Sequence, residues 1–237
     1  MRIFLIIGFL LTALISIGQN EQDSILLLNG KVYYGEVTGI EKIEGDSVLN
    51  FNTLNKKNEK VTDQLSLYRV FSYTKNGQEN IMYSQNEFLG NYLSVNETKE
   101  VTIGSYDARQ TFKPTVPFWT TYTLGLGVSV MDTYLSQKVL DKANYTNPYG
   151  YTTPGLFKDR LSLLPVLVPI VASVSWSLPS FKLKEKKMIH KSYFNNVNYY
   201  RGYHRIAKQK RMLGSMLGGF AGIATGWTTH LIINAFN

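Results

Sequence analysis

Four glycines recur at a strict four-residue interval near the C-terminal end of this 237-residue sequence, at Gly214, Gly218, Gly222 and Gly226. The surrounding stretch, 212–237, contains no Asp, Glu, Lys or Arg. Residues four apart lie on one face of a helix, so this spacing gives that face a row of positions without side chains. In lipid, such a face lets a second helix approach closely. The pattern therefore predicts a membrane helix that packs against another helix through these glycines.

Two other uncharged stretches, 114–131 and 161–181, are candidates for further membrane segments. Crossing a bilayer takes about 20 apolar residues, a length that 161–181 and 212–236 both reach. The first stretch is weaker, because it has only marginal length and contains four threonines and two prolines. We therefore expect a helical membrane region over 114–237 with full spans at 161–181 and 212–236 and a partial or weak span at 114–131.

The first 18 residues are typical of a secretory signal peptide. Arg2 is followed by an apolar stretch from Ile3 to Ile17, and Ser16 and Gly18 supply the small residues before a cleavage site. The alternative is an uncleaved N-terminal anchor. Together with the expected spans, this segment predicts an integral protein of a bacterial cell envelope, favouring the cytoplasmic membrane, with its N-terminal domain exported.

Residues 19–90 have the pattern of short strands separated by turns. Asn29-Gly30 and Asn76-Gly77 are the residue pairs that tight hairpins prefer. No stretch between them has helical periodicity, so we expect a small antiparallel β-barrel or meander over 19–90. A short helical linker over 91–113 follows, with a capping box at its start and a break near Gly104. The predicted fold class is an α+β membrane protein.

Charge is distributed unevenly along the chain. Residues 19–113 carry 10 Lys or Arg and 13 Asp or Glu, whereas residues 182–211 carry 10 Lys or Arg and one Glu. Basic loops beside membrane segments stay in the cytoplasm and attract anionic lipid headgroups. We therefore assign topology and headgroup contacts to the ten basic residues Lys182, Lys184, Lys186, Lys187, Lys191, Arg201, Arg205, Lys208, Lys210 and Arg211.

The same charge decides between possible topologies. If all three segments cross, the basic loop 182–211 lies outside the cytoplasm, against the positive-inside rule. If only 161–181 and 212–236 cross, the loop is cytoplasmic, and we prefer this arrangement. A third arrangement keeps three spans by leaving the N-terminal segment uncleaved and the β domain cytoplasmic. Basic residues interleaved with tyrosines can also bind an acidic partner or single-stranded nucleic acid, but we favour lipid and expect no nucleic-acid partner.

The sequence offers little for catalysis. It has no cysteine, and its three histidines are not spaced as metal ligands, so we expect no metal and no cofactor. Asp107 and Arg109 lie only two residues apart, so they do not face each other on a helix, and we favour a surface ion pair or a membrane-proximal anchor. His230 is expected at the far membrane interface. We predict no catalytic residue and no enzymatic activity.

Some residues resemble known groups of proteins. The run Leu27-Leu28-Asn29-Gly30-Lys31, followed by Tyr34, Gly35 and Val37, resembles the opening of Sm-like and SH3-like small barrels. The segment 104–109, which reads Gly-x-x-Asp-Ala-Arg, and the Tyr/Lys/Arg-rich residues before the glycine-rich helix look like uncharacterised exported, membrane-anchored proteins of Bacteroidota. The resemblance implies a small β module and a membrane anchor, and it implies no activity.

The leading functional hypothesis is a non-enzymatic, membrane-anchored envelope protein that presents its small β domain to a protein or envelope component. Its helices would pack on each other, in a homo-oligomer or against a membrane partner protein. The alternative is a glycine-zipper pore or an accessory subunit of a transporter. An enzyme would need catalytic groups that the fold gathers from scattered positions.

Overall fold

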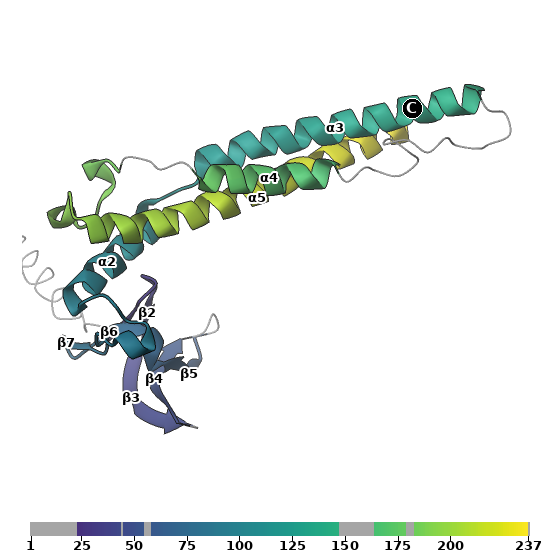
Figure 1. The fold of residues 1–237 in the computed structure, drawn as a ribbon. Coiled ribbons are helices and arrows are strands. Elements are labelled where there is room, and N and C mark those ends of the chain that lie inside the picture. Colours follow the sequence, from purple (N-terminus) through teal and green to yellow (C-terminus); the bar gives the residue numbers. More distant parts are fainter. Residues whose placement is uncertain (1–22, 44, 55–57, 147–163, 179–182, 237) are drawn as a thin grey trace, which may run out of the picture. The chain divides into compact units, whose positions relative to one another are not determined.

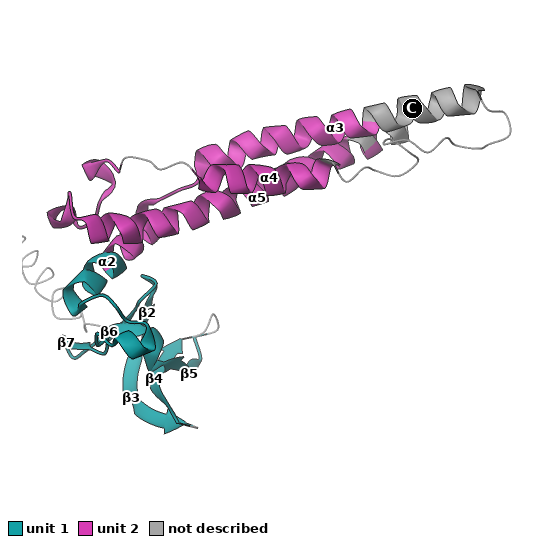
Figure 2. Cartoon of the chain, in the orientation of Figure 1, with its two compact units in different colours: residues 1–102 teal, residues 103–237 magenta. Residues whose placement is uncertain are grey.

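The computed structural model describes residues 23–43, 45–54, 58–146, 164–178 and 183–236, without the side chains of 134–146, 164, 230 and 233–236. The chain forms two compact units, Met1–Thr102 and Ile103–Asn237 (Figure 2). We call them the β unit and the helical unit. The expected signal peptide, 1–18, lies outside the described residues.

Seven strands are described in the β unit (Figure 1). They are β1 (Ser24–Leu27), β2 (Val32–Tyr34), β3 (Glu36–Ile43), β4 (Asp46–Leu54), β5 (Lys60–Ser66), β6 (Val70–Lys75) and β7 (Gln78–Ile81). They form two antiparallel sheets, one in the order β2-β1-β6-β7 and one in the order β3-β4-β5. The expectation of one small barrel or meander is therefore wrong for the strands that the structure describes.

Two interruptions explain why one sheet becomes two. Strands β2 and β3 are separated at Gly35, where an added Cβ would overlap the backbone carbonyl oxygen of Asn52. Only glycine permits such a close approach of two backbones. Strands β5 and β6 are separated by a 3-10 helix, η1 (Leu67–Arg69), and belong to different sheets.

Both sheets contribute to one apolar core. Ile25 of β1 and Phe51 of β4 are at most 1% exposed and belong to the same buried cluster. Asp23 also joins the two sheets, because its carboxylate accepts hydrogen bonds from the backbone N–H of Val37 and of Asn76, both at 3.0 Å. The β unit therefore has a core of its own.

The predicted turn at Asn76-Gly77 and the predicted capping box are confirmed. The prediction of the same turn for Asn29-Gly30 is wrong, because Gly30 has a positive φ but Asn29 does not, and the Gly30 N–H donates to the Leu27 carbonyl at 2.8 Å. Asn76 and Gly77 have φ angles of 51° and 78°, as a tight hairpin turn requires, and they connect β6 to β7. At the start of α2 (Val95–Thr111), the Ser94 N–H donates to Glu97 at 2.9 Å, and the Glu97 N–H donates to the Ser94 hydroxyl at 3.3 Å. This is a capping box. The expected break near Gly104 is wrong, because α2 is continuous.

Three long helices form most of the helical unit: α3 (Thr115–Thr146), α4 (Leu164–Ser177) and α5 (Val197–Phe236). They lie side by side in Figure 1. The 40 residues of α5 include five of the ten basic residues that were expected in a loop over 182–211. The helix begins early because Tyr199, Tyr203 and Ala207, spaced four apart, form one fully buried face.

The membrane predictions are wrong. None of the described helices combines the length and the apolar composition that a membrane span requires. Within the described residues α4 has only 14 residues, whereas a span takes about 20. In α3 and α5, threonines, serines and glycines lie among the apolar residues and lower the mean hydropathy of these stretches. The fold class of a membrane protein, the integral-membrane location, the transmembrane helices and the glycine zipper within such a helix are all contradicted by this finding.

Candidate functional site

The densest group of polar contacts in the helical unit surrounds Asp107, a fully buried carboxylate on α2. Its Oδ2 accepts hydrogen bonds from the Tyr199 hydroxyl at 2.6 Å and from the backbone N–H groups of Ile189 at 3.1 Å and His190 at 2.9 Å. Its Oδ1 lies 2.7 Å from Nδ1 of His190. Such partners replace the water that a buried carboxylate has lost. We call Asp107, His190 and Tyr199 the carboxylate hub.

The hub corrects the sequence-based interpretation of Asp107. A surface ion pair is excluded, because the side chain is 0% exposed. The residues that surround the carboxylate are His190 and Tyr199, which are 83 and 92 positions away in the sequence. Arg109 contributes its backbone carbonyl, which accepts a hydrogen bond from Lys210. No local motif marks such a long-range cluster, so sequence reasoning missed it.

The hub fixes the orientation of the His190 ring. A carboxylate can only accept, so Nδ1 of His190 must carry the hydrogen between them. The side chain is 41% exposed, and the Tyr106 ring lies edge-on to it at 6.1 Å between ring centroids. A carboxylate that orients an imidazole is also found in general-base catalysis. In the part of the chain that the structure describes, however, no nucleophilic side chain hydrogen-bonds to this ring.

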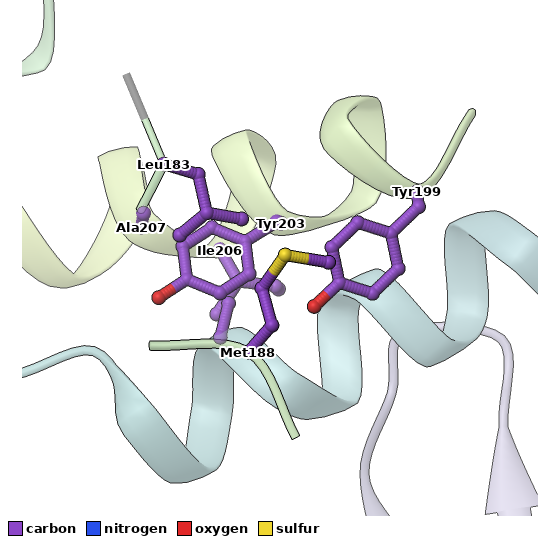
Figure 3. Packing of buried hydrophobic residues seen from close by; sticks show 7 residues of the cluster. Leu183, Met188, Tyr199, Tyr203, Ile206 and Ala207 are labelled. Carbon is purple, nitrogen blue, oxygen red and sulfur yellow. The ribbon is translucent and has the colours of Figure 1, made fainter. Parts of the chain in front are cut away.

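Tyr199 and Tyr203 form the centre of the core next to the hub. Both are fully buried, and Figure 3 shows the Met188 side chain beside their rings. Burial raises the pKa of the Tyr199 hydroxyl, and its hydrogen bond to the Asp107 carboxylate raises it further, so Tyr199 stays a donor. Burial also raises the pKa of Tyr203, whose hydroxyl lies 3.1 Å from that of Thr111.

Small residues bring α2 close to α5. A Cβ at Gly104 would overlap the backbone carbonyl oxygen of Tyr199, and Ala108, four positions later, is fully buried. Asp107 lies three positions after Gly104, so all three residues share one face of α2. The segment 104–109 therefore forms a helix face that meets another backbone and carries the hub carboxylate.

Three of the ten predicted headgroup residues have partners within the chain. The Lys210 ammonium donates to the backbone carbonyls of Ala108, Arg109 and Phe112, which caps the C-terminal end of α2. Burial lowers the pKa of Lys210. The guanidinium of Arg211 lies 5.9 Å from the centre of the Phe112 ring, and Arg205 donates to the Ser105 hydroxyl at 3.3 Å.

Six other residues of that set are exposed. None of the six has an ion-pair partner among the described residues. They are Lys184, Lys186, Lys187, Lys191, Arg201 and Lys208. Lys182 lies outside the described residues. The structure therefore divides the predicted basic set into residues that hold the helical unit together and residues that leave uncompensated charge on its surface.

The four glycines of α5 face α3. A Cβ at Gly218 or Gly222 would overlap the backbone carbonyl oxygen of Phe118 or Tyr122, respectively. A Cβ at Gly214 would lie 2.8 Å from the Pro114 ring, and one at Gly226 would overlap the Ser129 hydroxyl. We call this contact the glycine seam.

Hydroxyl groups and one further glycine add to the packing of α5. The Thr121 hydroxyl donates to the backbone carbonyl of Ser215 at 2.7 Å, across the seam. The hydroxyl of Tyr122 lies 3.3 Å from that of Thr225. Gly219, one position after Gly218, faces Pro169 of α4, since a Cβ there would lie 2.6 Å from its ring. Helix α5 therefore contacts both neighbouring helices through glycine.

The outer faces of the three helices are apolar. Residues 115–131, 164–177 and 212–236 contain no charged residue. Their large apolar side chains with at least 45% exposure are Val116, Trp119, Leu124, Val130, Met131, Leu167, Ile170, Val171, Val174, Leu213, Leu217, Leu231 and Ile232. Apolar surface of this extent is typical of a face that meets a partner.

No metal centre is present among the described residues, where no group of His, Asp and Glu has a suitable arrangement. His190 is oriented by the hub. Burial lowers the pKa of His204, helped by the nearby charges of Lys208 and Arg211. The side chain of His230 lies outside the described set. The absence of a cofactor stays a prediction.

In the β unit, large apolar side chains are exposed on the loop of residues 84–93, which we call the docking loop. It contains a 3-10 helix, η2 (Glu87–Leu89), and the left-handed residue Gly90, with a φ of 79°. Phe88 is fully exposed, Leu89 is 75% exposed and Tyr92 is 71% exposed. Sequence reasoning missed this loop, because its one visible signal is a short apolar cluster between asparagines.

No family model matches the chain, and no curated protein or solved structure was found to be similar to it.

Proposed function

We propose that this chain is a non-enzymatic binding protein whose β unit holds a protein partner through the docking loop. The observation that carries the proposal is the full exposure of Phe88 on a loop whose backbone is fixed by its own hydrogen bonds. Rigid loops that present aromatic side chains are common binding sites, because the scaffold fixes the geometry and the side chains supply the affinity.

The docking loop is ordered before any partner arrives. Asn86 and Asn91 exchange backbone hydrogen bonds at 3.0 and 2.9 Å, and the Asn86 side chain accepts from the Phe88 N–H at 3.0 Å. Tyr83 and Gln85 donate across the base of the loop to the carbonyls of Leu93 and Tyr92. A loop held in this way loses little conformational freedom when it binds.

The chemistry of the loop favours a protein partner. Residues 84–93 contain no Lys or Arg, and their one charged residue is Glu87. An anionic lipid surface would attract a basic loop. A pocket in a protein, apolar inside and neutral or basic at its rim, would instead accept the ring of Phe88. We therefore expect Phe88 to be the anchor, with Leu89 and Tyr92 beside it.

The test is site-specific photo-crosslinking in the native host cell. A photoreactive phenylalanine analogue at position 88 should give a discrete adduct, whereas the same analogue at the exposed position Gln64 of β5 should not. The crosslinked protein is then purified, and its affinity for the chain is measured. Phe88→Ser should weaken that affinity by about tenfold or more, with an unchanged melting temperature, because the ring has no buried contact to lose.

The proposal would be overturned by equal adducts at positions 88 and 64, or by a purified partner that binds Phe88→Ser as tightly as the wild type. The affinity of the purified partner for the Leu89→Ser and Tyr92→Ser variants is measured in the same way. Both side chains are less exposed than Phe88, and we expect smaller losses of affinity from each.

A second candidate function is self-association through the helical unit, supported by the uncharged outer faces of α3, α4 and α5. A second copy would bury the same apolar residues on both sides, as symmetric dimers do. The test is the molar mass of the purified chain by light scattering. Val171→Glu and Leu217→Glu place charges at positions that are 63% and 64% exposed. Both variants should shift the mass toward the monomer, and a monomeric wild type would end this candidate.

A further inference from the structure

The exposed basic residues of the helical unit lie on a segment that the fold fixes in place. Between Leu183 and Phe194 the chain forms two short 3-10 helices, η3 (Glu185–Lys187) and η4 (Lys191–Tyr193). Leu183 and Met188 are 6% and 5% exposed and belong to the buried cluster of Figure 3. The segment is therefore attached to the core at both of these residues.

The carboxylate hub adds a third attachment. Asp107 accepts hydrogen bonds from the backbone N–H groups of Ile189 and His190, in the middle of the segment. Lysines occur on both sides of these attachments, at Lys184, Lys186, Lys187 and Lys191, and all four are exposed. Because the backbone is held at these attachments, the segment that carries the four lysines does not depend on a partner for its order.

The charge of this surface is uncompensated. Glu185 is the one acidic residue between 182 and 211, against ten basic residues. None of the four lysines has an ion-pair partner among the described residues. Clustered like charges repel one another, so the surface gains from an anionic partner that neutralises several of them at once.

Exposed apolar residues accompany the lysines. Ile189, Phe194 and Val197 are 50%, 42% and 80% exposed in the same stretch of chain. Lysines with aliphatic and aromatic side chains between them match the interface of a bilayer, where headgroup phosphates lie above acyl chains. The match to single-stranded nucleic acid is poorer, because stacking uses several accessible rings in succession. Phe194 is the one aromatic residue in the exposed class between 184 and 203, and Tyr199 and Tyr203 are fully buried.

We infer that the segment 184–197 is a peripheral binding site for a phospholipid surface rich in anionic headgroups. The lysines contact headgroup phosphates, and Ile189, Phe194 and Val197 contact the boundary with the acyl chains. No helix enters the bilayer in this arrangement. The inference goes beyond the partner proposed for the docking loop and does not depend on it, because the residues concerned belong to the other unit.

The experiment is sedimentation of the full chain with vesicles. One set contains phosphatidylglycerol and phosphatidylcholine, and the other contains phosphatidylcholine alone. We expect much stronger binding to the anionic set in about 0.05 M salt, and loss of that difference in about 0.5 M salt, where surface charges are screened. The ratio of the two partition coefficients is the quantity of interest, because apolar surface elsewhere on the chain affects both sets.

A charge-matched pair of variants locates the site. The first replaces Lys184, Lys186, Lys187 and Lys191 with glutamine, and the second replaces four lysines of the β unit, Lys31, Lys42, Lys60 and Lys75. Each juxtamembrane lysine contributes about a fivefold change in partitioning. The first variant should therefore lower the anionic-to-neutral ratio at least tenfold, and the second should leave it within about twofold. Replacement of Ile189, Phe194 and Val197 by serine, in addition to the four lysine replacements of the first variant, should weaken binding to the anionic vesicles further.

Three results would overturn the inference. The first is equal binding to the two vesicle sets by the wild type. The second is an equal effect of the two glutamine variants, which would make net charge alone responsible. The third is that single-stranded RNA or polyglutamate binds the same four lysines and that anionic vesicles do not displace it. This result would assign the surface to a different macromolecule. Inorganic phosphate as competitor should have no effect, since a single small anion cannot neutralise several lysines.

Discussion

Helix α5 is held at two places by opposite chemistry. At its N-terminal end the carboxylate hub joins it to α2 through a buried charge with hydrogen bonds from Tyr199, Ile189 and His190. Further along, the glycine seam joins it to α3 through backbone contact without side chains. The hub depends on buried polar groups that all need hydrogen-bond partners, whereas the seam depends on the absence of side chains at its glycines. The two contacts should therefore respond to different substitutions.

The largest effect is expected at the hub, from Asp107→Ala. This variant leaves the Tyr199 hydroxyl, two backbone N–H groups and the His190 ring without their acceptor. Buried donors that lose their partner cost about 1–3 kcal/mol each, and relaxation of the segment 183–194 recovers part of this. We expect a loss of about 4 kcal/mol in the free energy of unfolding, measured by denaturant titration.

Asp107→Asn is the matched control for that variant. The amide has almost the same shape and keeps one carbonyl acceptor, so a loss of about 2 kcal/mol is expected. A loss below about 1 kcal/mol from Asp107→Ala would contradict a structural role for the hub. It would also revive the enzymatic interpretation of the Asp107–His190 pair, because a carboxylate that contributes little stability needs another reason to be buried.

The second effect tests the seam, with a matched pair of glycines. Gly222→Ala places a Cβ on the Tyr122 carbonyl oxygen, whereas Gly127→Ala on α3 places one in open space. Overpacking costs about 1–3 kcal/mol and more where backbone is involved, so we expect a loss of about 3 kcal/mol from Gly222→Ala. Gly127→Ala should be neutral or stabilising by up to about 1 kcal/mol, because alanine is the better helix former.

The pair is read from denaturation midpoints of the two variants under the same conditions. Equal midpoints would show that α3 and α5 do not meet at Gly222. A double variant that combines Asp107→Ala with Gly222→Ala then tests whether the two contacts are independent. Its loss in the free energy of unfolding should equal the sum of the two single losses, because the sites are distant from each other.

Local rules recovered the parts of this fold that depend on neighbouring residues. The turn at Asn76-Gly77 and the capping box at Ser94 and Glu97 both follow from residues at most three apart. The four-residue spacing of the glycines likewise identifies one face of a helix. It does not identify the environment of that helix. The length and the lack of charge of the stretch predict a lipid setting, which the described helices contradict.

The failures have the same origin. The hub unites Asp107 with residues more than 80 positions away, and no pattern in the sequence links them. The division of the β unit into two sheets depends on the approach of Gly35 to Asn52, a contact across strands. The basic segment was interpreted from its charge, although Tyr199, Tyr203 and Ala207 carry a helical period. The high density of Lys and Arg predicts a loop, whereas the four-residue spacing of these buried side chains indicates a helix.

The smallest effect distinguishes the two contacts by pH, through Tyr199→Phe. The fold raises the pKa of Tyr199, so the unfolded chain ionises this phenol first, near its ordinary value of about 10. Above that pH the unfolded state binds fewer protons than the folded state, and the free energy of unfolding falls as pH rises. The stabilisation by Tyr199 is complete below about pH 10 and is lost as pH rises above it. The glycines of the seam carry no ionisable side chain.

The measurement is the difference in the free energy of unfolding between the wild type and Tyr199→Phe at neutral pH and above pH 10. At neutral pH the variant should lose about 2 kcal/mol, the typical value for a hydrogen bond to a charged group. The difference should shrink at alkaline pH, because phenylalanine has no proton to lose. Lys210, whose lowered pKa gives the opposite slope, is present in both proteins and cancels. A pH-independent difference would place the Tyr199 hydroxyl outside the buried network and leave the glycine seam as the main attachment of α5.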